Sequence, residues 1–166
     1  MKSIYKRRSI RKYQKDPVDE KLLSECIKAG MNAPSARNQQ VWHFVLVQDR
    51  EMLDKIPTVH PYASMIKEAP AAILVCADLS VEKSKDYWVQ DLGACTQNIL
   101  LMATELGLAT VWLGVHPRQD RVDGLRKLFK LPEQVMPYSL IPIGYGDEKK
   151  QENNNFIEER IHNDVW

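Results

Sequence analysis

The sequence lacks the glycine-rich loops with which many nucleotide-binding proteins hold phosphate. Lys149 stands where a Gly-x-Gly-x-x-Gly motif beginning at Gly144 and Gly146 would need its third glycine, and no Walker-type Gly-Lys-Ser/Thr occurs. The histidines have no metal-ligand spacing relative to one another or to a cysteine. No nucleophile and base stand in a pattern typical of acyl transfer. We therefore expect no metal site and assign no catalytic side chain.

Cysteine and long apolar runs are also scarce. Cys26, Cys76 and Cys95 are odd in number and lie far apart among apolar residues. This arrangement does not suit a disulfide framework or a zinc site, and it predicts reduced thiols in the core of a cytoplasmic protein. No stretch approaches the roughly 18 apolar residues of a membrane span, and the N-terminus has no apolar signal segment. We expect no membrane partner.

Net charge is close to balanced, since the 166 residues carry a formal charge of +1. This value gives no electrostatic reason to expect a nucleic-acid partner. Hydrophobic residues make up 44% of the chain and charged residues 27%, which are ordinary values for a folded domain. The length suits one domain that spans residues 1–166.

A dense basic run, Arg7-Arg8-Ser9-Ile10-Arg11, stands near the N-terminus just before a predicted helix. Three guanidinium groups and one hydroxyl offer the charge and paired donors that a phosphate group needs. Basic runs of this length are more often solvated surface, so the run alone does not establish a phosphate site. An anion site without an acid–base pair is typical of proteins whose chemistry belongs to a bound cofactor.

Apolar runs predict about four buried strands. They span residues 41–47, 71–77, 110–115 and 138–144. His43 lies within the first run, so we expect a core histidine with a hydrogen-bond partner and not a base.

Apolar residues at helical spacing predict helices between these strands. The first begins at 16–19, where Asp16 would cap it and Pro17 would follow, and ends at Gly30 or Asn32. The others span residues 50–56, 87–106 and 118–131. Strands alternating with helices indicate an α/β fold.

Polar segments predict the surface features. Residues 57–70 are expected to form a mobile connection, and residues 80–86 a surface loop near a ligand mouth. The predicted helix at 87–106 is apolar around much of its circumference, which favours a second buried surface such as a subunit interface. The polar tail at 147–166 ends in apolar residues, which indicates an arm docked on another surface, such as a partner chain.

Several separated stretches together resemble the nitroreductase family of FMN-dependent enzymes. Residues 7–13 resemble its N-terminal signature, and residues 33–42 its Pro-Ser-x-x-Asn-x-Gln-x-Trp loop. Its central helix and following strand are matched by 91–98 and 105–114. Residues 143–146 and the ending 160–166 also fit. The similarity covers nearly the whole chain in the family's order.

The resemblance implies a fold and a set of cofactor-binding residues. The fold would be α/β (α+β) and nitroreductase-like, with a central mixed sheet of about four core strands flanked by helices and a C-terminal arm exchanged with the partner subunit. Arg7, Arg8, Ser9 and Arg11 match the positions that hold the FMN phosphate and ribityl chain and reach the pyrimidine edge of the flavin. Pro34, Ser35, Asn38 and Gln40 match the loop that contacts the flavin from the other subunit. Trp112, Leu113 and Gly114 match the segment along the isoalloxazine, although the strand pattern alone would make Trp112 a core aromatic.

One departure concerns the phosphate. The family has a Lys or Arg shortly before its C-terminal ending, whereas this chain has Asn153-Asn154-Asn155. Arg160, Lys149 and Lys150 are the candidates to replace that cation.

The function implied by the resemblance is that of a homodimeric FMN-dependent oxidoreductase with flavin sites at the subunit interface. It would use NAD(P)H to reduce the flavin by hydride transfer to N5, then reduce an electron-poor acceptor such as a nitroaromatic or a quinone by a ping-pong mechanism. Two alternatives stay open. One keeps the fold but performs reductive dehalogenation or flavin fragmentation, and the other is a non-catalytic flavin- or nucleotide-binding module.

Overall fold

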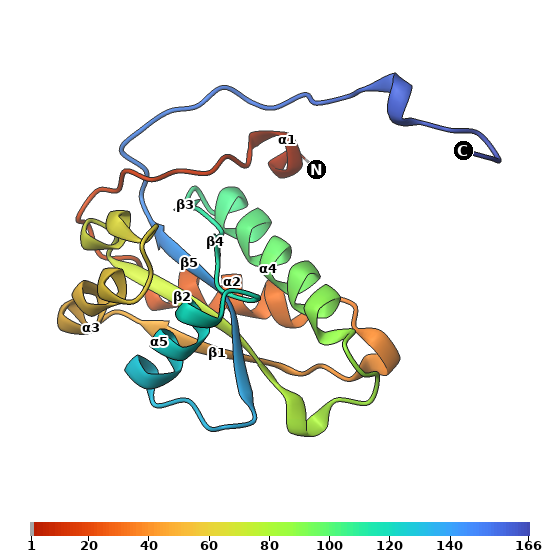
Figure 1. Ribbon diagram of the computed structural model, residues 1–166. Helices are drawn as coiled ribbons and strands as arrows, with labels where there is room; N and C mark the ends of the chain where they lie inside the picture. Colours follow the sequence, from red (N-terminus) through yellow and green to blue (C-terminus); the bar gives the residue numbers. More distant parts are fainter. Residues whose placement is uncertain (1) are drawn as a thin grey trace.

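Among residues 2–166, which the computed structural model describes, five strands form one antiparallel sheet (Figure 1). They are β1 (Trp42–Val47), β2 (Ala71–Asp78), β3 (Ala109–Thr110), β4 (Leu113–Gly114) and β5 (Val135–Gly144). The order is β1-β2-β5-β3, and β4 also pairs with β5. The family resemblance implied a mixed sheet, but the strands pair antiparallel, and parallel pairing is found at an isolated bridge between Ser9 and Thr110. Strand direction depends on how each connection crosses the sheet, which the apolar runs do not record.

Helices cover both faces of the sheet. They are α2 (Glu20–Met31), α3 (Arg50–Lys55), α4 (Trp88–Glu105) and α5 (Gln119–Phe129), while the short helix α1 (Ser3–Lys6) packs against α4. Short 3₁₀ turns are η1 (Ala36–Asn38), η2 (Ile56–Thr58), η3 (Ser64–Lys67), η4 (Leu79–Val81) and η5 (Glu158–Arg160). One apolar cluster lies between the sheet and α2 with α4, and a second lies between the sheet and α3 with α5.

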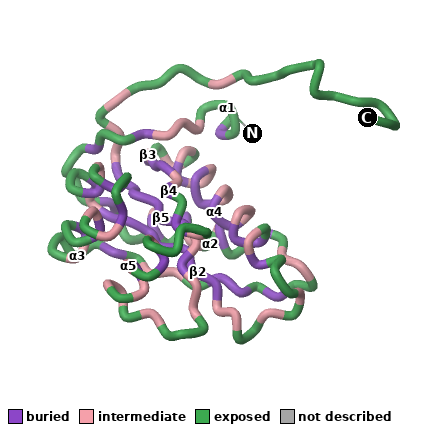
Figure 2. Tube along the Cα trace, viewed as in Figure 1, coloured by how far each residue is buried: buried purple, intermediate pink, exposed green. Residues whose placement is uncertain are grey.

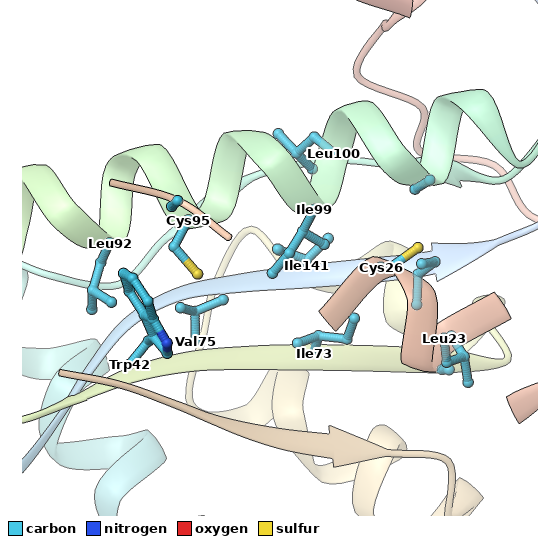
Figure 3. Packing of buried hydrophobic residues seen from close by; sticks show 14 of the residues in the cluster. Leu23, Cys26, Trp42, Ile73, Val75, Leu92, Cys95, Ile99, Leu100 and Ile141 are labelled. Carbon is cyan, nitrogen blue, oxygen red and sulfur yellow. The ribbon is translucent and has the colours of Figure 1, made fainter. Parts of the chain in front are cut away.

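The strand β2 contributes side chains to both clusters, which explains its continuous apolar run. Ile73 and Val75 face the cluster beneath α2 and α4, whereas Ala72, Leu74 and Cys76 face the other. Because successive strand side chains point to opposite faces, a strand covered on both faces needs apolar residues at every position. Figure 3 shows Leu92, Cys95 and Ile99 of α4 reaching toward Ile73 and Val75 of β2 and Ile141 of β5.

The strand β1 lies at the end of the sheet, and here the sequence prediction was wrong. The apolar run predicted a buried strand with His43 in the core, but His43 is exposed and Leu46 is 37% exposed. A terminal strand has neighbours on one edge and incomplete cover on its faces, so single positions on either face meet solvent. Local sequence does not distinguish this position from a central one.

Three further differences concern boundaries. Asp19, not Asp16, caps α2, and its carboxylate accepts a hydrogen bond from the Lys21 N–H at 2.8 Å. The predicted strand at 110–115 is divided into β3 and β4. The segment 57–70, predicted as a mobile connection, contains η2 and η3 and is packed against the core through buried Ala63 and Ile66.

The prediction that the cysteines lie unpaired in the core is confirmed, because Cys26, Cys76 and Cys95 are free and buried. Burial raises the pKa of each thiol to about 12, so the thiolate is strongly disfavoured at neutral pH. Within residues 2–166 no helix is both long and apolar enough to cross a membrane.

The two chain ends run side by side before the C-terminal arm leaves the domain (Figure 1). Asp147 N–H donates to the Lys12 carbonyl at 2.9 Å, and Asn153 N–H donates to the Tyr5 carbonyl at 3.1 Å. Beyond Asn153 every residue is exposed, which Figure 2 shows as an unbroken green tube. Phe156 is 71% exposed and Trp166 is 99% exposed. An arm with apolar side chains in water lacks a surface on which to bury them.

Substitution of Gly30 tests the packing of α2 against α4. A Cβ at Gly30 would lie 2.9 Å from Ile99 Cγ1 and 3.1 Å from Cys95 Sγ. We expect Gly30→Ala to lower the free energy of unfolding by about 1–2 kcal/mol through overpacking, measured by urea denaturation. The matched control is Gly93→Ala, where a Cβ would lie 3.4 Å from the Tyr138 hydroxyl. That variant should be neutral or up to about 1 kcal/mol more stable, since alanine favours helix. Equal effects of the two substitutions would contradict this account of the packing.

Candidate functional site

A pocket of about 440 Å³ lies beside β4 and brings together four separate parts of the chain. Arg11 comes from the N-terminal segment, residues 60–65 come from the connection between α3 and β2, and Arg121 comes from the first turn of α5. Trp112, Leu113 and Gly114 form one side. The structure therefore places four of the sequence-predicted residues, one from the basic run and three from the segment 112–114, around one pocket.

The backbone of Gly114 faces away from β5. Leu113 is opposite Leu140 and Gly114 is opposite Ser139, and Val115 N–H donates to the Tyr138 carbonyl at 3.0 Å. In an antiparallel pair, hydrogen-bonded and non-hydrogen-bonded residue pairs alternate, so the N–H and C=O of Gly114 point outward. A Cβ at Gly114 would meet nothing within 4 Å. This edge of β4 thus offers an open backbone to the pocket.

His60 contacts this edge as a neutral imidazole. Its Nδ1 accepts a hydrogen bond from the Tyr62 N–H at 3.3 Å, so the proton is on Nε2, which donates to the Gly114 carbonyl at 3.1 Å. The residue is only 1% exposed. Burial lowers the pKa of His60 below its ordinary value of 6.5, although the hydrogen bond to Gly114 opposes this shift.

Arg121 contacts the same carbonyl. Its Nη1 donates to the Gly114 oxygen at 2.7 Å, and its guanidinium lies over the Tyr62 ring at 5.1 Å from the centroid. Arg121 Nε is buried and has no hydrogen-bond partner among the described residues. Nothing in the sequence pointed to His60 or Arg121, because both act on a backbone atom distant in the chain.

The basic run is extended and is held between β3 and the segment after β5. Ile10 N–H donates to the Thr110 carbonyl at 3.0 Å, and Tyr13 forms a bridge with Gly146. Side chains alternate along an extended segment, so Arg7, Ser9 and Arg11 share one face. Arg8 is turned to the other face and donates to the Gln151 carbonyl. The run thus presents three of its four predicted residues together and separates Arg8 from them.

The charges of the basic run are not neutralised within the chain. Across residues 2–166, none of the three arginines of the run forms an ion pair. The nearby Glu148 carboxylate instead accepts a hydrogen bond from the Arg11 backbone N–H, which, with Lys150 nearby, holds the pKa of Glu148 below its ordinary range. The guanidinium groups of Arg7 and Arg11 therefore remain available to an anion.

Lys150 lies against the basic run. Its Nζ donates to the Ser9 carbonyl at 2.7 Å and lies 3.5 Å from the Glu148 carboxylate. Asn153 lies further along, where its N–H meets the Tyr5 carbonyl, and Arg160 lies on the exposed arm. Of the cations considered from sequence, Lys150 is the one in contact with the run.

The loop with Pro34, Ser35, Asn38 and Gln40 lies elsewhere, and none of these residues lines the pocket. Ser35 Oγ accepts a hydrogen bond from the Gln40 N–H at 3.1 Å. Positive φ angles occur at Arg37 (49°), Asn38 (50°) and Gln40 (47°). Non-glycine residues seldom adopt this conformation, and clusters of them occur at ligand-binding and switch segments.

Two residues that the sequence prediction omitted hold this loop in place. Asp91, 5% exposed, accepts hydrogen bonds from the Ala36 N–H at 2.9 Å and from Gln39 Nε2 at 2.6 Å. Gln39 Oε1 in turn accepts from the backbone N–H groups of Lys83 and Ser84 at 2.9 and 3.0 Å. The segment 80–86, predicted to lie near a ligand mouth, contacts this loop and does not line the pocket. A carboxylate in the first turn of an apolar helix was the available signal for Asp91.

The residues around the pocket fit a flat, anionic cofactor such as FMN. Arg11 offers positive charge without an ion-pair partner among residues 2–166, Trp112 offers an aromatic surface, and Gly114 offers an outward N–H with open space beside it. Trp112 is only partly buried and meets Tyr138 edge-on, with ring centroids 5.9 Å apart. Pockets that combine an apolar wall with a few fixed polar groups are typical of cofactor sites.

The chain is similar to known proteins in sequence and in structure. The family model described as the nitroreductase family matches residues 4–60 and 57–145. A Methanothermobacter thermautotrophicus protein, provisionally named an NADH dehydrogenase/NAD(P)H nitroreductase, is 51% identical over 166 residues, which are 100% of this chain and 87% of that protein.

Two solved structures share the fold. An FMN-dependent nitroreductase from Clostridium difficile R20291 is 31% identical with a TM-score of 0.92, and the match covers 99% of this chain and 98% of that one. A protein from Desulfovibrio desulfuricans, provisionally named a nitroreductase and solved in complex with FMN, is 25% identical with a TM-score of 0.85. That match covers 99% of this chain and 96% of that one.

Substitution of Gln39 tests the support of the loop. Gln39→Ala removes the partner of a buried carboxylate oxygen and of two backbone N–H groups, so the free energy of unfolding should fall by about 2 kcal/mol in urea denaturation. Gln90→Ala is the control, because Gln90 is exposed and precedes Asp91 on α4. If both variants have the urea midpoint of the wild type, the hydrogen bonds of Gln39 do not stabilise the loop.

Proposed function

Since the chain belongs to the nitroreductase family, we propose that it is an FMN-dependent oxidoreductase that transfers hydride from NAD(P)H to an electron-poor acceptor, such as a nitroaromatic or a quinone. The observation that carries this proposal is the meeting of Arg11, Trp112 and the open backbone of Gly114 at one pocket. One solved neighbour named as an FMN-dependent nitroreductase and another solved with FMN support it. The whole chain, residues 1–166, would form one FMN-binding domain.

Bound FMN would supply the redox chemistry, accepting hydride at N5 from NAD(P)H and giving it, in a ping-pong sequence, to a second substrate. The protein's own residues would bind and orient. Arg7 and Ser9 would hold the phosphate and ribityl chain, and Arg11 would place positive charge at the pyrimidine edge, where it favours an electron-rich ring. Trp112, Leu113 and Gly114 would lie along the ring. No side chain needs to donate a proton, because water can do so.

Lys150 would replace the C-terminal cation that the asparagines at 153–155 do not provide. Its contact with the Ser9 carbonyl supports this role, because it places an ammonium group beside the run proposed to bind phosphate. Arg8, on the other face of the run, would act by fixing the neighbouring C-terminal segment.

The functional form would be a homodimer with both flavin sites at the subunit interface. Pro34, Ser35, Asn38 and Gln40 lie away from the pocket of their own chain, as residues that contact the partner's flavin would. Their loop is nevertheless held in a strained, well-supported conformation. A shared site explains why such a loop is built at a distance from the pocket.

The C-terminal arm would dock on the partner subunit. It carries Phe156, Ile161 and Trp166 in water, whereas the same domain has a hollow of about 660 Å³ between α2 and α4 that is lined in part by the half-buried Leu101 and Met102. A second copy of the chain would cover both surfaces at once, which satisfies the closed symmetry of most homo-oligomers. The three free, buried thiols support a cytoplasmic location.

The proposed function is tested by the colour and the reduction of the purified protein. It should bind FMN and turn yellow, and anaerobic NADH or NADPH should bleach it. Arg11→Ala and Ser9→Ala should each weaken FMN binding; for Arg11, loss of a charge-assisted hydrogen bond corresponds to roughly 10- to 100-fold in the dissociation constant. Lys12→Ala is the control, since Lys12 carries the same charge on the opposite face of the run.

A protein that stays colourless after incubation with FMN would overturn the proposal. A yellow protein that neither nicotinamide bleaches would point to a non-catalytic flavin-binding module. Bleaching followed by turnover of a halogenated ring, with no turnover of nitroaromatics or quinones, would point to reductive dehalogenation. Unchanged FMN affinity in both Arg11→Ala and Ser9→Ala would reject the assigned site.

The dimer is tested by charge-free changes to the arm. Phe156→Ser combined with Ile161→Ser should raise the dimer dissociation constant at least roughly tenfold, because each buried apolar side chain contributes about 1.5–3 kcal/mol. Analytical ultracentrifugation measures this, with Val81→Ser as the control, since Val81 is also exposed but lies off the arm. A wild-type chain that sediments as a monomer while it holds FMN would contradict the shared site.

A further inference from the structure

The Gly114 carbonyl accepts hydrogen bonds from two side chains that come from different parts of the chain. His60 Nε2 lies 3.1 Å away and comes from the connection between α3 and β2. Arg121 Nη1 lies 2.7 Å away and comes from α5. A carbonyl at the end of a two-residue strand seldom needs two such partners, because water satisfies an exposed carbonyl equally well. The need of the Gly114 carbonyl for a hydrogen-bond partner therefore does not by itself explain why two side chains bind it.

The two donors are also fixed relative to each other. Tyr62 N–H donates to His60 Nδ1, and the Tyr62 ring lies under the Arg121 guanidinium. His60, Tyr62, Arg121 and Gly114 thus form a closed ring of contacts, which we name the Gly114 clamp. Each contact limits the freedom of the next, so the cost of ordering the long Arg121 side chain is shared among several interactions.

The clamp acts on the part of β4 that faces the pocket. Leu113 and Val115 are held on the β5 side by the strand ladder, and Gly114 between them has no side chain to restrict it. The clamp is what holds Gly114 from the pocket side. By fixing its carbonyl, the two donors also fix the outward N–H of the same residue, since both point to the same edge of an extended strand.

The clamp also contributes charge. Arg121 lines the same pocket as Arg11, and the described lining residues include no carboxylate. A guanidinium fixed by a carbonyl and an aromatic ring keeps its positive charge at a constant place, which favours negative charge in the pocket.

We propose that His60 and Arg121 are positioning residues that set the affinity of the site for FMN and the midpoint potential of the bound flavin, by holding Gly114 in the orientation that presents its N–H to the ring. This inference rests on the proposed function. It goes beyond the residues that the family resemblance assigns, because neither side chain is among them. Tyr62 supports both and is itself 66% exposed at the mouth of the pocket.

The test uses the full-length chain with paired variants. His60→Ala removes the donor, whereas His60→Gln retains an N–H at a comparable reach. Arg121→Met keeps the length of the side chain but removes its charge and donors. Arg118→Met is the control, because Arg118 lies just before the same helix, is exposed, and pairs with Asp120 outside the pocket. Circular dichroism and thermal unfolding establish that each variant is folded.

Three measurements follow on each variant. In the absence of flavin, ¹⁵N relaxation of the Gly114 amide should report greater motion in His60→Ala and Arg121→Met. With FMN, the dissociation constant should rise roughly tenfold in both. The midpoint potential, measured by equilibration with a reference dye, should fall; a tenfold change in the ratio of affinities for the two redox states corresponds to about 30 mV for a two-electron couple. His60→Gln and Arg118→Met should resemble the wild type.

The outcomes separate this inference from the proposed function. If the wild type binds FMN but His60→Ala and Arg121→Met retain its affinity and potential, the clamp is only a structural tie and the inference is overturned. The inference is also overturned if Arg118→Met shows the same losses, because the effect would then be one of general charge. If the wild type binds no FMN, the proposed function fails and the flavin role falls with it, while the Gly114 relaxation data still report whether the clamp orders β4.

Discussion

The antiparallel pairing of β5 is the constraint on which the rest of the structure depends. One edge of β5 holds β2, and the other holds β3 and then β4, so the short segment from Ala109 to Gly114 is placed at the edge of the sheet. The chain that leaves β5 continues as the neighbour of the basic run, through the bridge between Tyr13 and Gly146. A single ten-residue strand thereby positions both halves of the candidate flavin site, the backbone of β4 and the arginines near the N-terminus.

Sequence patterns correctly predicted those helices and strands whose burial is uniform along their length. The strand β2 is buried on both faces and reads as a continuous apolar run, and α4 packs on the core and reads as a long apolar helix. The patterns failed where the surroundings depend on position in the sheet. His43 occurs in a run whose other residues are all apolar, yet it is exposed because β1 is the terminal strand. Nothing local to residues 41–47 records that difference.

Some residues of the candidate site could likewise be predicted from the sequence, and others could not. The family resemblance selected Arg11 and the residues from Trp112 to Gly114, which the fold places around one pocket. It did not distinguish Arg8 from its neighbours, although side-chain alternation follows once the run is known to be extended. His60 and Arg121 could not be predicted from the sequence. Each donates a hydrogen bond to the Gly114 carbonyl, and a contact with a backbone atom is not encoded in the type of the residue that receives it. Residues whose side chains bind a distant backbone atom can therefore be identified only once the structure is known.

The position of the missing C-terminal cation also follows from backbone pairing. Residues 145–153 run antiparallel to residues 5–14, so Tyr145, Asp147 and Asn153 meet Gln14, Lys12 and Tyr5 in turn. A side chain that is to add charge beside Ser9 must therefore come from near residue 150. Position 153 has already passed the basic run, and a cation at 160 lies on the exposed arm. The register of the two chain ends, and not nearness to the C-terminus, determines which residue lies beside the run, and it places Lys150 there.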